Sequence, residues 1–190
     1  MPADLSGTWT SERLLLAVPD HRDLAELHRL YADPLVWRDD PLTRHVAPAQ
    51  TATMIDQWRA AWLSDGLGMW VARETAPATQ GRLVGIGGTF IRYGVAWNLG
   101  FRLSPACWGQ GYAQEITRAA LDAARQVRAD LPMTAYLLEG NVRSQRATER
   151  TGLRRVWRGP DAGNPDPHAI RLLYADRALP STVVRALTEN

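Results

Sequence analysis

Lysine is absent from this chain, whose 22 basic residues are all arginine. Schiff-base chemistry on a lysine is therefore excluded, as is a Walker-type phosphate loop, which needs a Gly-Lys-Ser/Thr sequence. Net charge is also scarce, because 20 acidic residues leave a balance of only +2. No basic run alternates with aromatic residues, so we do not expect the chain to bind nucleic acid.

Cysteine is represented only by Cys107. A single cysteine forms no disulfide within the chain and no cysteine cluster for zinc, so we expect a reducing compartment and no metal site. The sequence also lacks a charged and then apolar leader, and none of its apolar stretches approaches the ~20 residues that span a bilayer. These absences predict a cytoplasmic protein without a membrane partner.

The residues that are present fit one globular domain. The 190 residues are 45% hydrophobic and 22% charged, which is ordinary for such a domain. We expect a loose lead-in over residues 1–11, a domain over 12–176 and a C-terminal tail over 177–190 with a helical segment.

Apolar periodicity and end signals predict the elements of that domain. Helices are expected over 20–33, 48–66, 112–129, 141–151 and 181–188, and strands over 13–18, 69–74, 83–92, 95–103, 134–138, 153–158 and 169–174. Short connections between strands indicate antiparallel pairing. One unit instead reads strand, loop, helix, strand, so 95–103 and 134–138 should pair in parallel. The expected fold is α/β (α+β), a single domain with a mixed, mostly antiparallel sheet and helices on both faces.

A glycine loop over residues 108–113, Trp-Gly-Gln-Gly-Tyr-Ala, stands between a predicted strand and a predicted helix. The first turn of a helix has free N–H groups and a partial positive charge, so it attracts anions. Gly109 and Gly111 let the backbone approach a phosphate with no Cβ in the way. A dinucleotide fingerprint needs a third glycine where Gln114 stands, and an early parallel unit. The loop therefore predicts a pyrophosphate cradle of another kind.

Two segments resemble one known family. Residues 103–115 are similar to the acyl-CoA loop of the GNAT N-acyltransferase superfamily, Arg/Gln-x-x-Gly-x-Gly/Ala, with Trp108 at its first position. The Trp-Gly-x-Gly-Tyr-Ala form resembles the branch that acetylates the N-terminal alanine or serine of ribosomal proteins. Residues 141–153 resemble the family's Asn-x-x-Ser…Glu-Lys/Arg-x-Gly-Phe/Leu segment. Each motif lies on the expected element, and that context strengthens both.

The resemblance implies a GNAT fold and an acetyl-CoA-dependent N-acetyltransferase. Acetyl would pass to a primary amine by direct attack in a ternary complex, with no covalent enzyme intermediate. The pantetheine arm would follow the main chain near Phe101 and Leu103, the pyrophosphate would take amides of the loop, and Arg146 would reach the 3′-phosphate together with Arg143 and Arg150. The residues expected at acetyl-CoA are Phe101, Leu103, Trp108, Gly109, Gln110, Gly111, Tyr112, Ala113, Asn141 and Arg146. Asn141 also suits a helix N-cap.

The sequence indicates the catalytic residues less clearly than the residues expected at acetyl-CoA. The resemblance makes Ser144 the candidate general acid for the departing thiolate, although a first-turn serine also bonds the backbone. Thr148 stands where some relatives carry a tyrosine. The strand run 97–100, Trp-Asn-Leu-Gly, lacks the glutamate that many relatives place there as a base. Asp161 is our candidate base, and the alternatives are Asp39, Asp40, His45, Asp166 and His168.

The acceptor site is expected to include Trp37, Asp40, Trp97 and Asn98. A tryptophan offers area and one N–H donor, although both tryptophans also suit core packing. Among acceptors, we expect a protein N-terminus first, and a small amine such as an aminoglycoside is the alternative. A non-catalytic, acyl-CoA-binding regulatory domain is the alternative from a different class, because the strand carboxylate is absent. The sequence leaves a monomer or a homodimer open.

Overall fold

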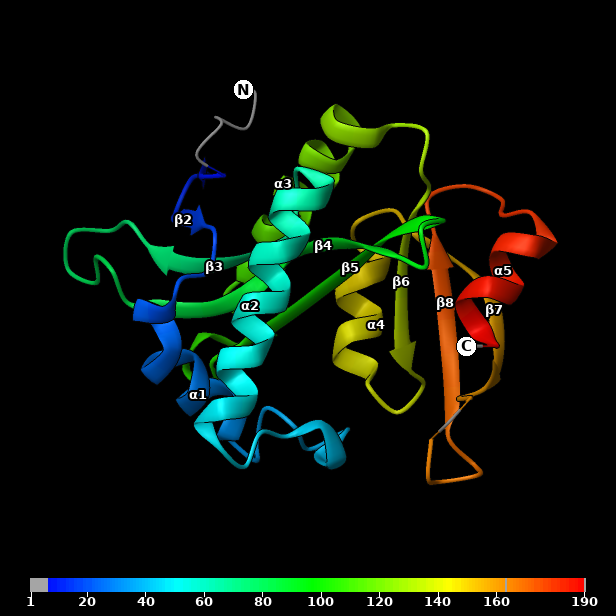
Figure 1. Cartoon of the computed structure of the whole chain (residues 1–190), viewed down its shortest axis with the longest axis horizontal. Helices are drawn as coiled ribbons and strands as arrows, with labels where there is room; N and C mark the ends of the chain where they lie inside the picture. Colours follow the sequence, from blue (N-terminus) through cyan, green and yellow to red (C-terminus); the bar gives the residue numbers. More distant parts are fainter. Residues whose placement is uncertain (1–6, 163, 190) are drawn as a thin grey trace.

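The computed structural model describes residues 7–162 and 164–189 (Figure 1). Within them, eight strands form one sheet in the order β1-β2-β3-β4-β5-β6-β8-β7. The strands are β1 (Trp9–Thr10), β2 (Leu14–Ala17), β3 (Met69–Glu74), β4 (Leu83–Arg92), β5 (Ala96–Leu103), β6 (Met133–Leu138), β7 (Arg154–Pro160) and β8 (Ile170–Ala175). The α-helices are α1 (Leu24–Ala32), α2 (Pro48–Asp65), α3 (Tyr112–Arg128), α4 (Val142–Glu149) and α5 (Ser181–Thr188). Short 3-10 turns cover His21–Asp23, Pro41–Thr43 and Pro105–Cys107.

The sheet is antiparallel except where β5 meets β6, as the sequence predicts. That parallel pairing is short, because only Trp97↔Met133 and Asn98↔Thr134 are partners. Beyond Asn98, β5 stays paired with β4 while β6 stays paired with β8. The two strands therefore separate after Asn98, and one edge of β5 loses its strand partner.

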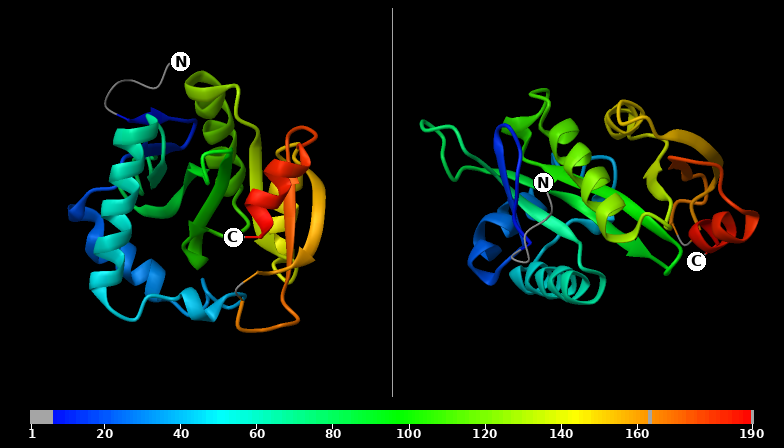
Figure 2. Two further views of the ribbon diagram at one scale, coloured as in Figure 1. Left: turned by 45° about the vertical axis from the view of Figure 1, so that its right-hand side comes forward. Right: turned by 90° about the horizontal axis from the view of Figure 1, so that it is seen from above.

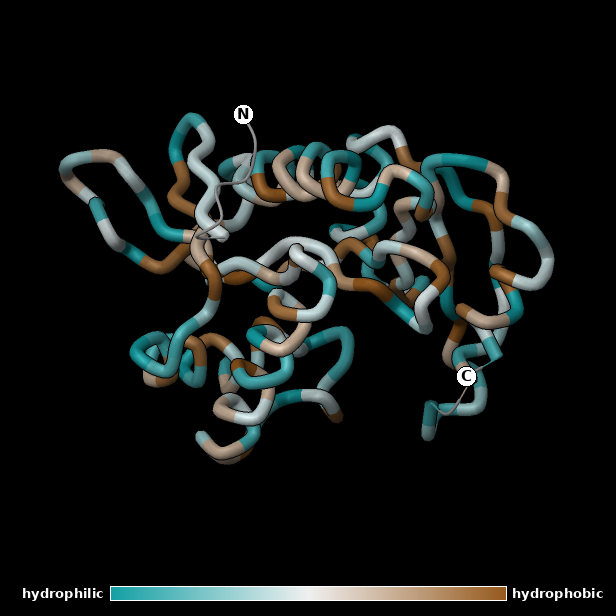
Figure 3. Tube along the Cα trace, turned by 45° about the horizontal axis from the view of Figure 1, so that its top comes forward, coloured by the Kyte–Doolittle hydropathy of each residue, from teal (hydrophilic) through white to brown (hydrophobic). Residues whose placement is uncertain are grey.

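Helices cover both faces of the sheet, which confirms the predicted layers. In the view from above, α1 and α2 lie on one side of the sheet, and α3 and α4 lie on the other (Figure 2). Hydrophobic segments gather mainly between these layers, and hydrophilic segments lie mainly in the outer turns and helix faces (Figure 3). The separation of β5 from β6 thus occurs between two helical layers.

A face of small residues on α3 packs closely on β4. Ala119, Ala120, Ala123 and Ala124 are all buried in the core cluster that joins α3 to the sheet. A Cβ added at Gly87 of β4 would lie only 2.6 Å from Ile116 Cγ2 of α3. Glycine in the strand and alanine on the helix therefore set this close approach.

Local signals place the element ends. The side chain of Asp20 accepts from the Arg22 amide, and the side chain of Asp23 accepts from the Asp20 amide, which completes a capping box. Pro48 occupies the first turn of α2, and Gly66 ends that helix with φ 71°. None of the described helices is long and apolar enough to cross a membrane.

The expected loose lead-in is wrong at Trp9 and Thr10, which form β1 against β2. The indole Nε1 of Trp70 donates to the Gly7 carbonyl at 3.0 Å, which holds the segment before β1 on the core. Residues 1–6 of the lead-in lie outside the described residues. The predicted helix of the tail is present as α5, and its Leu187 is buried against Ala96 and Leu173.

Candidate active site

The glycine loop leads directly into α3, as the sequence predicts. Gly109 has φ 76° and Gly111 has φ 84°, both in the left-handed region that favours glycine. Gly111 is the N-cap of α3, and no side chain caps the helix there. The first amides of a 17-residue helix are therefore left for a ligand. This is the geometry of an anion cradle.

A salt bridge fixes the loop to the turn before β2. The guanidinium of Arg13 donates to the Gln110 carbonyl at 3.0 Å and lies 2.8 Å from Glu115 on α3. Glu115 also accepts from the hydroxyl of Ser11 at 2.6 Å. Burial pushes the pKa of Glu115 up, but the hydrogen bonds from Ser11 and Arg13 outweigh it and lower the pKa. Glu115 thus stays ionised and ties α3 to the N-terminal strands.

A second tie runs from the first residue of α3 to β3. The hydroxyl of Tyr112 donates to Glu74, whose side chain is 4% exposed. Arg82 grips the same carboxylate with two bonds of 3.0 and 2.6 Å. Hydrogen bonds from Arg82, then Thr79 and Tyr112, lower the pKa of Glu74 to about 2. The side chain of Tyr112 is therefore an anchor, and Tyr112 faces the cradle through its backbone.

A cavity of about 370 Å³ runs along the loop. Every residue expected at acetyl-CoA lines it except Gln110, whose side chain folds back to the Ala106 carbonyl at 2.7 Å. The guanidinium of Arg143 stacks 4.1 Å from the Trp108 ring and joins α4 to the loop. Arg146 and Arg150 line the same cavity, so cationic side chains of α4 border it.

The alternation of β5 decides which backbone groups face the gap. The Trp97 amide donates toward β6, to Pro132, whereas the Ser104 amide donates toward β4, to Val84, each at 2.9 Å. Because successive residues of a strand point to opposite edges, the odd-numbered residues of β5 present their backbone to the β6 side. Phe101 is among them, as expected of a pantetheine contact.

Leu103 also presents its backbone to the β6 side, but its carbonyl is already engaged. Its carbonyl already accepts the indole Nε1 of Trp108 at 2.9 Å. That bond seats the Trp108 ring at the start of the loop. Leu103 therefore has its amide, rather than its carbonyl, to offer a ligand in the gap.

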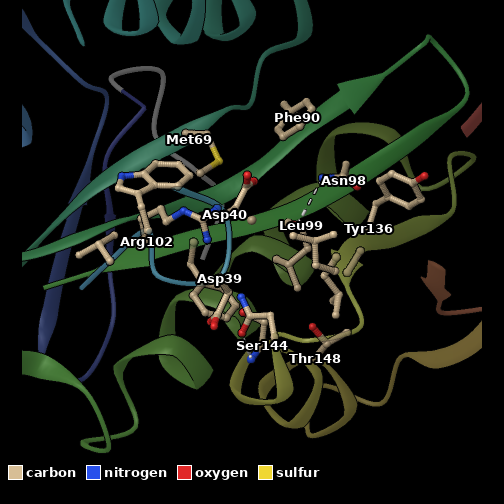
Figure 4. A pocket seen from close by; sticks show the side chains of 18 of the residues that line it. Asp39, Asp40, Met69, Phe90, Asn98, Leu99, Arg102, Tyr136, Ser144 and Thr148 are labelled. Atoms are coloured by element: carbon tan, nitrogen blue, oxygen red, sulfur yellow. Dashed lines mark hydrogen bonds between the residues drawn. The ribbon is translucent and has the colours of Figure 1, made fainter. Parts of the chain in front are cut away.

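A second cavity of about 270 Å³ continues from the first between β5 and β6 (Figure 4). Both cavities are lined by Phe101, Asn141 and Ser144, so they form one passage, which we call the cleft. Three of the four predicted acceptor residues, Trp37, Asp40 and Asn98, line this second cavity. The cleft thus joins the glycine loop to the predicted acceptor side.

Asn141 and Ser144 occupy the middle of the cleft. The side-chain oxygen of Asn141 accepts the Ser144 amide at 3.0 Å, so Asn141 is the N-cap of α4. Asn141 also lines both cavities, so it caps α4 and borders the cleft at the same time. Ser144 is half-buried in the first turn of α4.

Two buried polar atoms in the cleft lack a partner among the described residues. They are the indole Nε1 of Trp37 and the carboxamide oxygen Oδ1 of Asn98. These residues are only 6% and 7% exposed. Arg102 lies 4.2 Å over the Trp37 ring, which leaves the ring edge with the N–H unmatched. Buried polar groups are normally satisfied, so a ligand is the natural partner of both.

Trp97 does not belong to the acceptor side, and that prediction is wrong. Its side chain points to the α3 face of β5, is 1% exposed and donates to the Arg128 carbonyl at 3.1 Å. Asn98, the next residue, points to the opposite face and lines the cleft. The strand alternation therefore separates two neighbours that the sequence grouped together.

The candidate base Asp161 lies apart from the cleft lining. Its carboxylate is 2.8 Å from Arg171 Nε and its side chain is 6% exposed. Arg171 itself lines the cleft, whereas Asp161 does not. The residue of this ion pair that borders the cleft is therefore the arginine. This position does not suit a base, since the carboxylate is already engaged.

The alternative bases divide into two groups. His45 bonds Thr51 at 2.8 Å and stacks 4.7 Å from Tyr31, and burial lowers its pKa. It joins the loop after α1 to α2 and is not among the cleft residues. Asp39 and Asp40 do line the cleft. Within the described residues, the Asp40 carboxylate has no hydrogen bond or ion pair.

A third cavity, of about 580 Å³, adjoins the cleft. It lies between the segment 39–42 and the tip of the β7–β8 hairpin. Asp39, Asp40 and Leu138 line both this third cavity and the second one. The remaining candidates, Asp166 and His168, line this third cavity. They are therefore neighbours of the cleft and not part of it.

Several residues of the site escaped the sequence analysis. Arg102 and Tyr31 line the cleft, and Arg13 and Glu74 fix the loop from behind. The sequence could have indicated Arg102, since it is the one charged residue between Ala96 and Leu103. The sequence does not indicate the other three, because their partners lie far away in the chain.

Comparison with known proteins agrees with this architecture. The family description "Acetyltransferase (GNAT) domain" matches residues 13–154. The chain belongs to the GNAT acetyltransferase family.

Solved structures show the same fold. A GnaT-family acetyltransferase structure from Bordetella pertussis superposes with a TM-score of 0.73 at 19% identity, covering 90% of this chain and 99% of the other. RimL, the ribosomal L7/L12 α-N-protein acetyltransferase in complex with coenzyme A, gives 0.70 at 19% identity, covering 87% and 94%. The Bacillus subtilis (strain 168) protein YkkB is 30% identical over 102 residues, or 51% of this chain, and the match spans 59% of that relative's length.

Proposed function

We propose that the protein is an acetyl-CoA-dependent N-acetyltransferase that acetylates a primary amine in a ternary complex. One observation carries the proposal: two cavities that share Phe101, Asn141 and Ser144 in their lining together reach from the glycine loop to the point where β5 leaves β6. The uncapped start of α3 suits a pyrophosphate, and the free edge of β5 suits the amides of a pantetheine arm. Arg146 and Arg150 border the same cavity and suit a terminal phosphate.

The chemistry requires positioning more than covalent participation. The amine lone pair forms the C–N bond, the C–S bond breaks, and its electron pair goes to sulfur. The excess proton leaves the nitrogen, and the sulfur takes one proton. Ser144 is the proposed donor to the departing sulfur, because it lines both parts of the cleft.

The proposed acceptor is the α-amino group of a peptide or protein. Two features support an extended acceptor: the cleft adjoins the cavity beside the β7–β8 hairpin, and the Trp37 Nε1 needs a hydrogen-bond acceptor such as a peptide carbonyl. The fold similarity to RimL points the same way. A small cationic amine, including an aminoglycoside, remains the second candidate because Asp39 and Asp40 line the cleft. The non-catalytic domain remains the third, because β5 carries no carboxylate.

The test is release of free CoA thiol from acetyl-CoA with a panel of amines. The panel contains peptides with free N-termini, the same peptides with blocked N-termini, and small polyamines including an aminoglycoside. We expect turnover with free N-terminal peptides and none with their blocked forms. Turnover with small amines alone would transfer the assignment to the second candidate, and tight CoA binding without any turnover would support the binding domain.

A further inference from the structure

The carboxamide oxygen of Asn98 is an unmatched acceptor in the wall of the cleft. Asn98 is 7% exposed, and its Oδ1 lacks a partner among the described residues. Its Nδ2 makes only a long bond of 3.4 Å to the Leu99 carbonyl (Figure 4). A buried oxygen without a donor costs free energy, and a ligand N–H would remove that cost.

The position of Asn98 fits the reacting end of the cleft. Asn98 and Thr134 are the last partners of the β5–β6 pairing, so Asn98 stands where the two strands part. Its side chain shares a face of β5 with Arg102, which contacts Trp37 on the acceptor side. The backbone of the following residues faces the gap proposed for the pantetheine arm. An amine that enters from the acceptor side would meet Asn98 close to the thioester.

This inference rests on the proposed function. We propose that Asn98 accepts a hydrogen bond from the attacking nitrogen of the acceptor and orients its lone pair, without taking its proton. Asn98 is then a catalytic residue that contacts the substrate but is not a base, because a carboxamide does not bind a proton at neutral pH. The nitrogen forms the bond to the acyl carbon, the C–S electron pair goes to sulfur, and the extra proton passes from nitrogen to bulk water.

A site without a general base needs an amine that is already uncharged, so the pKa of the amine selects the acceptor. At pH 7 about one peptide α-amino group in six to ten is uncharged, but only about one lysine side chain in 2,500. An α-amine therefore presents a reactive lone pair several hundred times more often. The inference narrows the acceptor class to weakly basic amines, with peptide N-termini foremost.

Other ionisable groups line the same cavity of the cleft as Asn98 and must be separated from this role. They are Tyr31 on α1, Asp39 and Asp40 on the loop after it, Arg102 on β5, Tyr136 on β6 and Arg171 on β8. Burial raises the pKa of both tyrosines, so neither is a base near neutral pH. Asp40 is the one rival with a free carboxylate, and its Asp40→Asn variant belongs in the test.

The experiment measures kcat/KM for the acceptor against pH with two peptides of otherwise identical sequence. One begins with alanine and the other with β-alanine, whose amine is more basic because its carbonyl lies one carbon further away. The variants are Asn98→Leu, Asn98→Asp and Asp40→Asn. Gln57→Leu is the matched control, since it removes an exposed carboxamide on α2. KM for acetyl-CoA and thermal unfolding report on the integrity of each variant.

We expect the acid limb of the native profile to move to higher pH with the β-alanyl peptide. Asn98→Leu should lower kcat/KM for the acceptor by at least tenfold with KM for acetyl-CoA unchanged, and Gln57→Leu should have no effect. Asn98→Asp should move the acid limb to lower pH for both peptides, because it supplies a base.

The inference is overturned if Asn98→Leu keeps kcat/KM within twofold of the native value. It is equally overturned if both peptides share one acid limb, and loss of that limb in Asp40→Asn would identify Asp40 as the base. A kcat/KM within twofold of the native value in Asn98→Leu contradicts only the role of Asn98. Absence of turnover with any amine in the native protein contradicts the proposed function and this inference together.

Discussion

Ser144 is held in the cleft by its backbone, because its amide donates to the Asn141 side chain. This hydrogen bond holds the backbone of Ser144 and does not use the hydroxyl. Ser144 lines both the loop part and the acceptor part of the cleft, where the sulfur of a thioester would leave. At the scale of single residues, the site therefore offers an O–H donor on α4 and an oxygen acceptor, Asn98, on β5.

Ser144→Ala tests the role of that hydroxyl. We expect kcat to fall by about a hundredfold, which is the low end for loss of a proton donor, while the Kd for CoA stays unchanged. Steady-state kinetics and calorimetric titration of CoA measure the two quantities. Ser181→Ala on the exposed start of α5 is the control. Equal losses in kcat and in CoA affinity would instead mark Ser144 as a structural residue.

At the scale of elements, the start of α3 is held by three other parts of the chain. The turn before β2 provides Arg13, which bonds the Gln110 carbonyl, and the end of β3 provides Glu74, which bonds the Tyr112 hydroxyl. Arg82, just before β4, in turn holds the Glu74 carboxylate. These ties are charged and partly or fully buried, so each is costly to break on one side only. The orientation of the cradle therefore depends on Arg13, Glu74 and Arg82, which are not among the residues that line the cavity along the loop.

Glu74→Gln tests this support through pH. The pKa of Glu74 is lowered from 4.5 to about 2, so its contribution to stability is fully present above pH 4.5 and is lost as the pH falls toward 2. We expect Glu74→Gln to lose about 1–3 kcal/mol of unfolding free energy at pH 7, and the deficit to shrink as the pH falls below 4.5.

Thermal unfolding of the native and variant proteins between pH 7 and pH 3 measures the effect. Glu12→Gln, at an exposed carboxylate in the turn before β2, is the control and should match the native protein throughout. A deficit of the same size at both ends of the range would show that ionised Glu74 does not stabilise the loop anchor.

Element bounds were largely predictable because their signals are local. Periodicity predicted the ends that the structure shows for β3, β4 and α5, and Pro48 and Gly66 predicted the ends of α2. The two-residue strand β1 was missed because so short a segment has no period. Its stability comes from pairing with β2 and from the Trp70 bond to Gly7, both of which depend on tertiary structure.

At the scale of the whole molecule, the two halves of the site differ in how far the sequence reveals them. The cradle is one contiguous loop, so its residues and its chemistry are read together. The acceptor side is assembled from the loop after α1, from β5, β6 and β8, and from α4. Trp37 and Trp97 look alike in sequence, and only the pleat of β5 and the packing of α3 send Trp97 into the core.

A substitution at Gly111 tests the proposed binding of CoA along the cradle. A Cβ at Gly111 would meet only Arg13 Nη2 at 3.5 Å, an ordinary contact, so the protein itself has room for it. It would nevertheless stand where a phosphate approaches the first amides of α3. Gly94, in the β4–β5 turn, has a similar φ of 71° and open space around it, so Gly94→Ala is a control of matched backbone strain.

The measurement is calorimetric titration of CoA into the native protein, Gly111→Ala and Gly94→Ala. We predict that Gly111→Ala weakens CoA binding by at least tenfold, about 1.4 kcal/mol, while Gly94→Ala stays within twofold of the native affinity. A native-like Kd for CoA in a folded Gly111→Ala protein would contradict the assignment of the loop as the pyrophosphate cradle.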